Sequence, residues 1–376
     1  MKKILYISPY EEFVVAQNGG YGVVAESFKR MFDNMSSIEV EYVNINILAS
    51  GNLNRINQRF DVCILLVHPS SFENKIFKQN MEYVSSICDK TYIHIFWETS
   101  PTPSKWKWLW QSDIFTGFIS PSKFVFDMIN YETKKFNKEN HLIYCPVFEE
   151  DYEKYKISIS KKETEDVFNV LYMGQYTKRK GMEDAIIGFV QALSEYKDCR
   201  LVLKYHPLSD KELPASDLIS NLVSTNTKKM NAKIYEVTGN LSKDDIYSLY
   251  NEASVLLFPS RGEGYGLPLV EAGMIGLPCI YTDWSSTKET GKFRGNKSIA
   301  YILDTAQGMA QYDYEGNSVY AVPYIKDIVK NLKECYEAWK YSKEEYYEYT
   351  NNNDIDIIKK FGPKVFMEQI SKLIGE

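Results

Sequence analysis

The sequence predicts an α/β protein made of two doubly wound, parallel-sheet domains. The chain has 376 residues, which suggests two domains at roughly 150 residues each. Short apolar runs alternate with amphipathic stretches, as in parallel sheets whose faces are both covered by helices. The alternation stops once, in a charged segment at 149–166, and then starts again. These three observations together favour two domains of the same class.

The N-terminal domain is predicted to span residues 1–150. Its strands are expected in short apolar runs and its helices in amphipathic stretches. The expected strands are Lys3–Ser8, Asp61–Val67, Thr91–Phe96 and Gly117–Ile119, and the expected helices are Val23–Met35 and Ser122–Asn130. The charged stretch that follows is rich in Lys, Glu and Ser and is interpreted as a linker, residues 151–166.

The C-terminal domain is predicted to span residues 167–350. Its expected strands are Phe168–Met173, Arg200–Tyr205, Lys233–Glu236, Ser254–Pro259 and Cys279–Thr282. Its expected helices are Met182–Tyr196, Lys243–Asn251 with Ser242 as N-cap, Leu267–Met274 and Tyr324–Tyr341. A terminal helical segment, residues 351–376, completes the chain.

Composition narrows the choice of partners and compartment. The formal net charge is −6 and the pI is about 5.5, which disfavours a nucleic-acid partner without excluding one. No apolar stretch approaches the ~20 residues of a transmembrane helix, and Pro9 interrupts the first apolar run too early for a signal peptide. The six cysteines are far apart and lie mostly in apolar runs, which is typical of buried free thiols in a reducing cytoplasm.

The most informative segment is residues 258–278. Two carboxylates, Glu263 and Glu271, flank a turn rich in glycine and proline where a strand-end loop becomes a helix. Glycines let the backbone approach a ligand closely, and the N-terminus of a helix attracts a diphosphate. A carboxylate on each side of such a loop can hold sugar hydroxyls at two ends of the ligand. The segment therefore predicts recognition of a nucleotide sugar.

This segment resembles the signature of retaining glycosyltransferases of the GT-B architecture, in particular the large family numbered four. Residues 170–185 provide a second match: a strand, a glycine (Gly174) and a basic residue before the Lys-Gly that opens a helix. Residues 320–333 resemble the family's late helix. The resemblance is clear over roughly 166–340 and weaker before that. It implies two Rossmann-like domains that face a central cleft, with the donor held mainly by the C-terminal domain. It also implies that the terminal helix, residues 351–376, crosses back to the N-terminal domain.

The resemblance also implies roles for residues of the donor site. Glu271 is expected to bind the ribose hydroxyls of the donor, and Glu263 to face the transferred sugar. Backbone amides are expected to contact the sugar hydroxyls or the phosphates. These contacts come from Tyr265, Gly266 and Leu267, with Gly264 and Gly174 also assigned to donor binding.

Lys180, helped by Arg179, is expected to neutralise the diphosphate leaving group. Cleavage of the glycosidic C–O bond builds negative charge on the diphosphate, and preorganised cations stabilise that charge most in the transition state. Many members of the family carry Arg directly after the strand glycine, where this chain has Gln175. Either Arg179 or Lys178 replaces that charge, or the leaving group is held less strongly. No cofactor and no catalytic metal are expected.

Two N-terminal segments are expected to line the same cleft from the other side. Residues 17–22, which include Gly20 and Tyr21, resemble the family's glycine-rich loop. Residues 97–103, which begin with Trp97 and Glu98, resemble a subset of the family with an acidic residue at that strand end. Gly20 is assigned to the donor, and Tyr21, Trp97 and Glu98 to the acceptor side.

Several other side chains have two interpretations. His94 is either a satisfied core histidine or a contact to the transferred sugar. His68, His141 and His206 are weaker candidates for a functional histidine. The tryptophans within 104–110 could stack sugars or bases, although packing is the default for at least two of the three. Asp354 and Asp356 have the spacing of a metal-binding pair, but a helix cap is favoured.

Alternatives from other classes remain at this point. A nicotinamide-dependent dehydrogenase needs a Gly-x-Gly-x-x-Gly directly after the first strand, and residues 8–22 lack that spacing. A non-catalytic nucleotide-sugar-binding protein would keep the fold without turnover. For an enzyme, the acceptor could be a glycan, a lipid, a protein or a hydroxylated base of modified DNA. The sequence does not identify the sugar, the nucleotide base or the oligomeric state.

Overall fold

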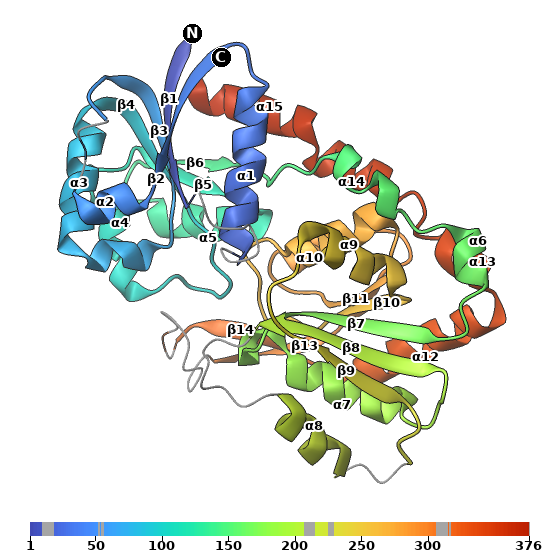
Figure 1. Cartoon of the computed structure of the whole chain (residues 1–376). Helices are drawn as coiled ribbons and strands as arrows, with labels where there is room; N and C mark the ends of the chain where they lie inside the picture. The colour runs from blue at the N-terminus through green and yellow to red at the C-terminus, as the bar shows by residue number, and fades with distance from the viewer. Residues whose placement is uncertain are drawn as a thin grey trace. The chain divides into compact units, whose positions relative to one another are not determined.

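The computed structural model describes residues 1–9, 19–51, 53, 56–206, 215–224, 229–305, 315 and 317–375 (Figure 1). The chain divides into two compact units. Unit 1 comprises Met1–Phe148, Ala310–Ser318 and Lys359–Glu376, and unit 2 comprises Glu149–Met309 and Val319–Ile358.

Unit 1 contains a parallel sheet of six strands in the order β2-β1-β3-β4-β5-β6. The strands are β1 (Lys2–Ser8), β2 (Ile38–Asn44), β3 (Phe60–Leu66), β4 (Cys88–His94), β5 (Gly117–Ser120) and β6 (Glu139–Leu142). The helical segments are α1 (Gly19–Asp33), α2 (Asn46–Ser50), η2 (Pro69–Glu73), α3 (Lys75–Ser86), η3 (Ser104–Trp106), α4 (Lys107–Gln111), α5 (Lys123–Thr133) and α15 (Pro363–Ile374).

Helices cover both faces of this sheet. Phe28 of α1 packs against Phe366 of α15, with ring centroids 4.8 Å apart, and also lies beside Tyr6 of β1. The opposite face packs against α3, α4 and α5 in one apolar cluster, in which Trp110 of α4 contacts Phe118 of β5. A sheet covered on both faces explains why its strands read as continuous apolar runs.

Unit 2 contains a second parallel sheet of six strands, in the order β12-β11-β10-β7-β8-β9, and an antiparallel pair β13-β14. The strands are β7 (Phe168–Gln175), β8 (Cys199–His206), β9 (Lys233–Val237), β10 (Val255–Phe258), β11 (Cys279–Thr282), β12 (Lys297–Ile299), β13 (Tyr301–Thr305) and β14 (Val319–Pro323). The helices are α6 (Ile159–Glu163), α7 (Met182–Leu193), α8 (Ala215–Ser224), α9 (Lys243–Glu252), α10 (Leu267–Ile275), α11 (Thr287–Thr290), α12 (Ile325–Tyr341) and α13 (Lys343–Glu348). Helix α14 (Asn353–Phe361) begins in unit 2, and its last residues, from Lys359, belong to unit 1.

The two faces of this second sheet are also covered. Phe168 of β7 packs against Trp339 of α12, with ring centroids 5.4 Å apart, and α12 packs against α7. Met173 of β7 points to the opposite face, where the Tyr250 hydroxyl of α9 lies 3.3 Å from its sulfur. Figure 1 shows α7 and α12 on one side of the sheet and α9 and α10 on the other. The prediction of two doubly wound α/β domains is therefore confirmed.

Each sheet has one point where the direction of strand addition reverses. In unit 1 this point lies between β1 and β3, and in unit 2 it lies between β7 and β10. Ligands of open α/β sheets bind outside the carboxyl ends of the strands at such a switch point. The topology therefore predicts that a ligand site lies at the loops after β1, β7 and β10.

Several elements differ from the expectations. The segment interpreted as a linker belongs to unit 2 and contains η4 (Glu149–Asp151), η5 (Glu153–Tyr155) and α6. Helix α1 begins at Gly19, four residues before the expected start. The expected N-cap at Ser242 is present, as a capping box with Asp245. All six cysteines are buried and free.

Candidate functional site

The candidate site of unit 2 is built from two loops at its switch point. The first loop leaves β7, passes through η6 (Lys178–Lys180) and enters α7. The second loop leaves β10 after Phe258 and enters α10 at Leu267. Both loops therefore start at the carboxyl edge of neighbouring strands, and they carry most of the predicted donor-binding residues.

Gly181 and the backbone around it hold the two loops together. Gly181 has a φ of +70°, and a Cβ atom at this position would collide with the carbonyl oxygen of Pro259. The Arg261 amide donates a hydrogen bond of 2.7 Å to the carbonyl of Arg179. Only glycine fits this close approach with a positive φ. The Lys-Gly sequence at 180–181 thus sets the distance between the two loops.

Glu263 lies at the centre of the loop cluster and is 6% exposed. Its Oε1 accepts hydrogen bonds from the Lys180 ammonium and the Ser260 hydroxyl, each at 2.6 Å. The Arg179 guanidinium is 3.4 Å from its Oε2. Burial alone would raise the pKa of Glu263, but the two cations outweigh burial and hold the pKa below its ordinary value. Glu263 is therefore an ionised carboxylate at neutral pH.

A second buried ion pair supports the same loops. The Nε and Nη2 groups of Arg261 donate hydrogen bonds to the carboxylate of Asp184 in α7, at 3.0 and 2.7 Å. Burial raises the pKa of Asp184, although the guanidinium of Arg261 partly offsets this effect. This pair was not predicted from the sequence. The only signal was an arginine inside the glycine-rich motif, because an aspartate in the first turn of a helix is common on its own.

Arg179 is placed differently from Lys180. Its Nη1 donates a 2.7 Å hydrogen bond to the carbonyl of Gly262, and the side chain is 6% exposed. Lys178 and Gln175 are both exposed. Arg179 therefore acts partly as a brace for the Glu263 loop, whereas the Lys180 ammonium is held by the carboxylate of Glu263.

The start of α10 is formed by Gly266, Leu267 and Pro268. Gly266 has a φ of +91°, and no side chain caps the helix. Tyr265 is buried, and its carbonyl accepts a hydrogen bond from the Thr290 hydroxyl. The N-terminus of an α-helix carries a partial positive charge that favours anions. Gly264 lies in the same loop, and Gly174, the residue before the last of β7, lies beside Lys180.

Glu271 lies further along α10, beyond the glycine-rich turn. The Tyr250 hydroxyl donates a 3.0 Å hydrogen bond to its Oε2. Burial raises the pKa of Glu271 to about 7, against the opposing effects of this hydrogen bond and of Lys243. The structure thus places the two carboxylates of the motif in opposite environments. Glu263 is paired with cations, and Glu271 is held by a neutral hydroxyl.

Unit 1 places His94 at the end of β4, fully buried. Neither ring nitrogen has a hydrogen-bond partner among the described residues. The imidazole packs against the rings of Phe96 (4.6 Å) and Phe28 (5.2 Å). Burial lowers the pKa of His94 to about 3. The side chain is in the core, but the protein groups described here do not satisfy its nitrogens.

The glycine-rich loop lies only partly within the described residues, because Gln17 and Asn18 fall outside them. Gly20 is exposed in the first turn of α1. The Tyr21 ring lies 5.4 Å from the ring of Phe96, and its buried hydroxyl has no partner in the described part of the chain. Burial, and to a smaller extent the charge of Glu98, raise the pKa of Tyr21. Tyr21 and His94 thus both contact Phe96.

Trp97 lies in the core rather than on the surface. It is 1% exposed, packs on Trp106 with ring centroids 4.5 Å apart, and donates its indole N–H to the carbonyl of Pro101. Glu98, the next residue, is partly exposed. Trp106 and Trp110 are also buried, while Trp108 is only partly buried. At least two of the three tryptophans in 104–110 therefore serve packing.

The remaining candidates have structural partners. His68 accepts a hydrogen bond from the amide of Ser70 at the start of η2, and His141 lies 3.0 Å from Glu139. Asp354, in the first turn of α14, pairs with Lys156 at 2.6 Å. In the described ranges, no cluster of three or more His, Cys, Asp or Glu side chains could hold a metal ion.

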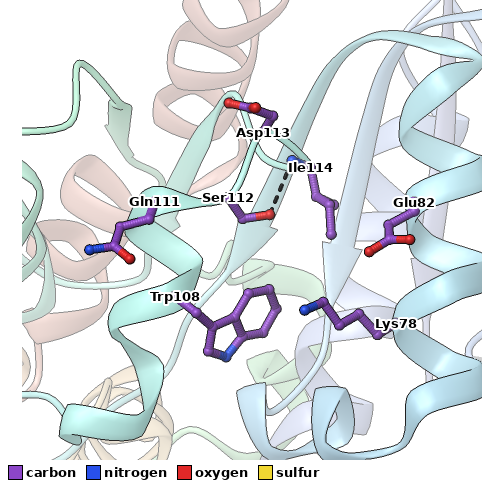
Figure 2. A pocket seen from close by; sticks show the side chains of 7 residues that line it. All are labelled: Lys78, Glu82, Trp108, Gln111, Ser112, Asp113 and Ile114. Atoms are coloured by element: carbon purple, nitrogen blue, oxygen red, sulfur yellow. Dashed lines mark hydrogen bonds between the residues drawn. The ribbon is translucent and has the colours of Figure 1, made fainter.

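Two cavities lie away from the candidate site. Figure 2 shows the one on unit 1, of about 420 Å³, where the Lys78 ammonium lies over the ring of Trp108. It is lined by Lys78, Glu82, Trp108, Gln111, Ser112, Asp113 and Ile114. The other, of about 330 Å³, lies in unit 2 between α9 and the strands β7 to β9. Apart from Trp108, one of the tryptophans within 104–110, neither cavity is lined by a predicted site residue.

Residues 153–300 match the family model described as "Glycosyl transferases group 1". A similar curated protein is the serotype-specific mannosyltransferase WbdA of Escherichia coli, 29% identical over 119 residues. That match covers 32% of this chain and 14% of the mannosyltransferase. An uncharacterized glycosyltransferase of Sulfolobus islandicus rod-shaped virus 1 is 24% identical over 35% of this chain and 37% of its own length. This chain therefore spans much less than two thirds of either relative.

Solved structures share the fold over the full length. HepE of Anabaena, in complex with UDP-glucose, has a TM-score of 0.62 at 11% identity, with 100% of both chains covered. Sucrose-phosphate synthase of Thermosynechococcus elongatus has a TM-score of 0.66 at 12% identity, over 99% of this chain and 98% of that one. None of the described helices is both long and apolar enough to cross a membrane. The predicted relation to GT-B glycosyltransferases is confirmed.

Proposed function

We propose that this relative of the GT-B glycosyltransferases, with its group 1 domain at 153–300, moves a sugar from a nucleotide-diphosphate donor to an acceptor hydroxyl. The observation that carries the proposal is the buried cluster of Glu263, Lys180 and Arg179 at the switch point of unit 2. In this cluster the carboxylate can bind the transferred sugar, and the adjacent cation can stabilise the diphosphate leaving group. Glu271 then receives the ribose hydroxyls.

The cation cluster explains how the C–O bond of the donor is broken. The acceptor hydroxyl oxygen bonds to the anomeric carbon as the bond to the diphosphate oxygen breaks, and the hydroxyl proton passes to the departing phosphate. The ammonium of Lys180 and the N-terminus of α10 stabilise the charge that builds on the diphosphate. Attack and departure on one face retain the anomeric configuration, and no covalent intermediate is needed.

The protein's own cations make a divalent metal unnecessary in this scheme. Lys180 and Arg179 supply the positive charge that Mg²⁺ or Mn²⁺ supplies elsewhere. We expect turnover to continue in excess EDTA. Loss of turnover in EDTA and its recovery with one divalent ion would contradict this part of the proposal.

Unit 1 supplies the acceptor side in this proposal, with Tyr21 and Glu98 near the acceptor and His94 near the transferred sugar. The support is the group of buried polar atoms at the carboxyl edge of its sheet, which lack partners in the described ranges. The six buried free thiols favour a reducing compartment, so the reaction is assigned to the cytoplasm. The acceptor is proposed to be a hydroxyl of a glycan, a lipid or a protein.

A thermal-shift screen tests the donor site directly. The wild type, Glu271→Ala and a control variant, Glu337→Ala, are heated with UDP, GDP and their hexose conjugates. Glu337 is exposed on α12, on the other face of the sheet. A ligand that binds only the native state adds ~2.7 kcal/mol of stability at a hundredfold excess over Kd. We expect one nucleotide to stabilise the wild type and Glu337→Ala, but not Glu271→Ala.

Turnover then separates an enzyme from a binding protein. With the nucleotide sugar that gives the shift, release of the free nucleoside diphosphate is followed with and without sugar acceptors. Release that depends on Lys180 supports the transferase. Tight binding without any release over hours indicates a nucleotide-sugar-binding protein, and no binding at all overturns the donor site.

A further inference from the structure

Lys204 is a buried cation that the proposed reaction does not yet use. It lies near the end of β8 and is 2% exposed. Its ammonium donates a 2.8 Å hydrogen bond to the carbonyl of Gly239 and lies 3.2 Å from Nε2 of His206. Across the described ranges, no carboxylate forms an ion pair with Lys204. The ammonium is therefore buried against neutral groups alone.

Such an arrangement is costly for the free protein. Removing an ammonium group from water without an anionic partner is unfavourable, and burial accordingly lowers the pKa of Lys204. Burial and the neighbouring ammonium also lower the pKa of His206, which keeps its ring neutral and able to accept a hydrogen bond. Buried, perturbed groups at the edge of a ligand site are often there to bind the ligand.

The strand register places Lys204 on the same face of the sheet as Glu271. Lys204 pairs with Met173 in the β7–β8 ladder, so both side chains point to one face. On that face the Tyr250 hydroxyl lies 3.3 Å from the Met173 sulfur and donates to Glu271 at 3.0 Å. Met173 and Tyr250 thus connect the position of Lys204 to the carboxylate that receives the ribose in the proposed function.

The orientation of the donor follows from its covalent structure, given the proposed function. The diphosphate is attached to the 5′ carbon of the ribose and lies at Lys180 and the start of α10. The base is attached to the 1′ carbon, on the other side of the ring. With the ribose at Glu271, the base points away from the start of α10 and across the face toward β8. Lys204 is the buried cation that the structure shows there.

We propose that Lys204 reads the nucleobase of the donor by donating a hydrogen bond to its carbonyl oxygen. In uracil that oxygen is O4 and in guanine it is O6. Cytosine and adenine carry an amino group at the corresponding position. That amino group and the Lys204 ammonium are both hydrogen-bond donors, so they cannot bind each other. Lys204 therefore selects UDP over CDP and GDP over ADP, and His206 and the Gly239 carbonyl hold the ammonium in place.

The test measures Kd for UDP, CDP, GDP and ADP by calorimetry. The proteins are the wild type, Lys204→Met and the control Lys197→Met. Lys197 is exposed and precedes β8 at the opposite edge of the sheet. Methionine keeps the volume of the side chain and removes its donors. We expect the wild type and Lys197→Met to prefer the keto base roughly tenfold or more, and Lys204→Met to lose most of that preference.

The other outcomes are distinct from one another. If Lys204→Met keeps the full keto preference, the Lys204 proposal is overturned while the donor site stands. If Glu271→Ala and Lys204→Met both bind as the wild type does, both proposals fail. If the wild type binds no nucleotide, the proposed donor site is wrong, and so is the proposed recognition of the base by Lys204. Near-ultraviolet circular dichroism of Lys204→Met, matching the wild type, shows that lost preference is not lost folding.

Discussion

The carboxyl edges of the two sheets differ in how their buried polar groups are hydrogen-bonded. In unit 2, Glu263 binds two cations and a hydroxyl, and Arg261 forms a two-nitrogen pair with Asp184. In unit 1, Ser8, Tyr21, His94 and Thr99 have buried polar atoms without a partner among the described residues. At the unit 2 edge these charged groups pair with one another, although Lys204 contacts neutral groups only and the buried Thr282 hydroxyl has no partner in the described ranges. At the unit 1 edge several neutral groups are without a described partner.

This difference indicates how each edge is prepared to bind a ligand. Buried polar atoms are almost always hydrogen-bonded, so atoms without a protein partner await water or a ligand. A network that is already paired holds its dipoles in place and needs little reorganisation during reaction. We expect unit 2 to be rigid and costly to mutate, and unit 1 to tolerate removal of its polar atoms until a ligand is present.

The largest effect is expected from breaking the Arg261–Asp184 pair. Asp184→Ala leaves a buried guanidinium without its partner, which costs about 3–5 kcal/mol of unfolding free energy. The control is Glu183→Ala, because Glu183 is the exposed neighbour in the same helical turn. Chemical denaturation of both variants measures the difference. A loss below about 1 kcal/mol for Asp184→Ala would show that the pair does not hold the loops.

The next effect concerns turnover. Lys180→Ala removes the cation nearest to Glu263 and is expected to lower kcat by about 10²–10³, with a smaller change in KM. Lys178→Ala is the matched control, since Lys178 is exposed in the same turn. Steady-state kinetics with the donor found in the thermal screen measures both constants. Equal losses in the two variants would assign the effect to overall charge rather than to the Lys180 position.

A third prediction uses the raised pKa of Glu271. A carboxyl whose pKa moves from 4.5 to about 7 on folding destabilises the native state as pH rises through this range. The full effect is up to about 3 kcal/mol at ~1.4 kcal/mol per pKa unit. Glu271→Gln removes it, so the variant should gain stability over the wild type between pH 5 and pH 8. Parallel pH profiles of the unfolding free energy would contradict the raised pKa.

The smallest effect is expected in unit 1. Because burial lowers the pKa of His94 from 6.5 to about 3, the unfolded chain takes up a proton below pH 6.5 and the native state does not. The wild type should lose ~1.4 kcal/mol per pH unit from this group, and His94→Leu should not. Denaturation at pH 7.5 and pH 5.5 compares the two proteins. If His94→Leu loses as much unfolding free energy as the wild type between pH 7.5 and pH 5.5, a group other than His94 causes the loss.

Much of the fold could be predicted from hydrophobic periodicity. Buried strands such as β3 and β10 are continuous apolar runs, and their positions were expected within a residue or two. The edge strands β2 and β6 were not predicted. Both have partly exposed faces and carry polar residues such as Glu39 and Asn140, so they lack the apolar run that marks a buried strand.

The candidate site could be predicted only where residues cluster in sequence. The motif at 258–278 predicted Glu263 and Glu271 on the two sides of one turn. This was possible because the loop and the helix that carry them are adjacent in the sequence. The Asp184 partner of Arg261 and the position of Lys204 depend on strand order and register. No local pattern contains these, since β7, β8 and β10 are neighbours only after the sheet has formed.

The contact between the two loops of unit 2 also has a consequence for how the protein folds. Arg179 and the Gly262 carbonyl that it binds are 83 residues apart in the chain. Closing so long a loop is entropically unfavourable until other contacts have formed, so the pocket is expected to assemble late in folding. A nascent or truncated chain that ends before β10 would therefore be unable to bind the donor, however well β7, β8 and β9 had formed.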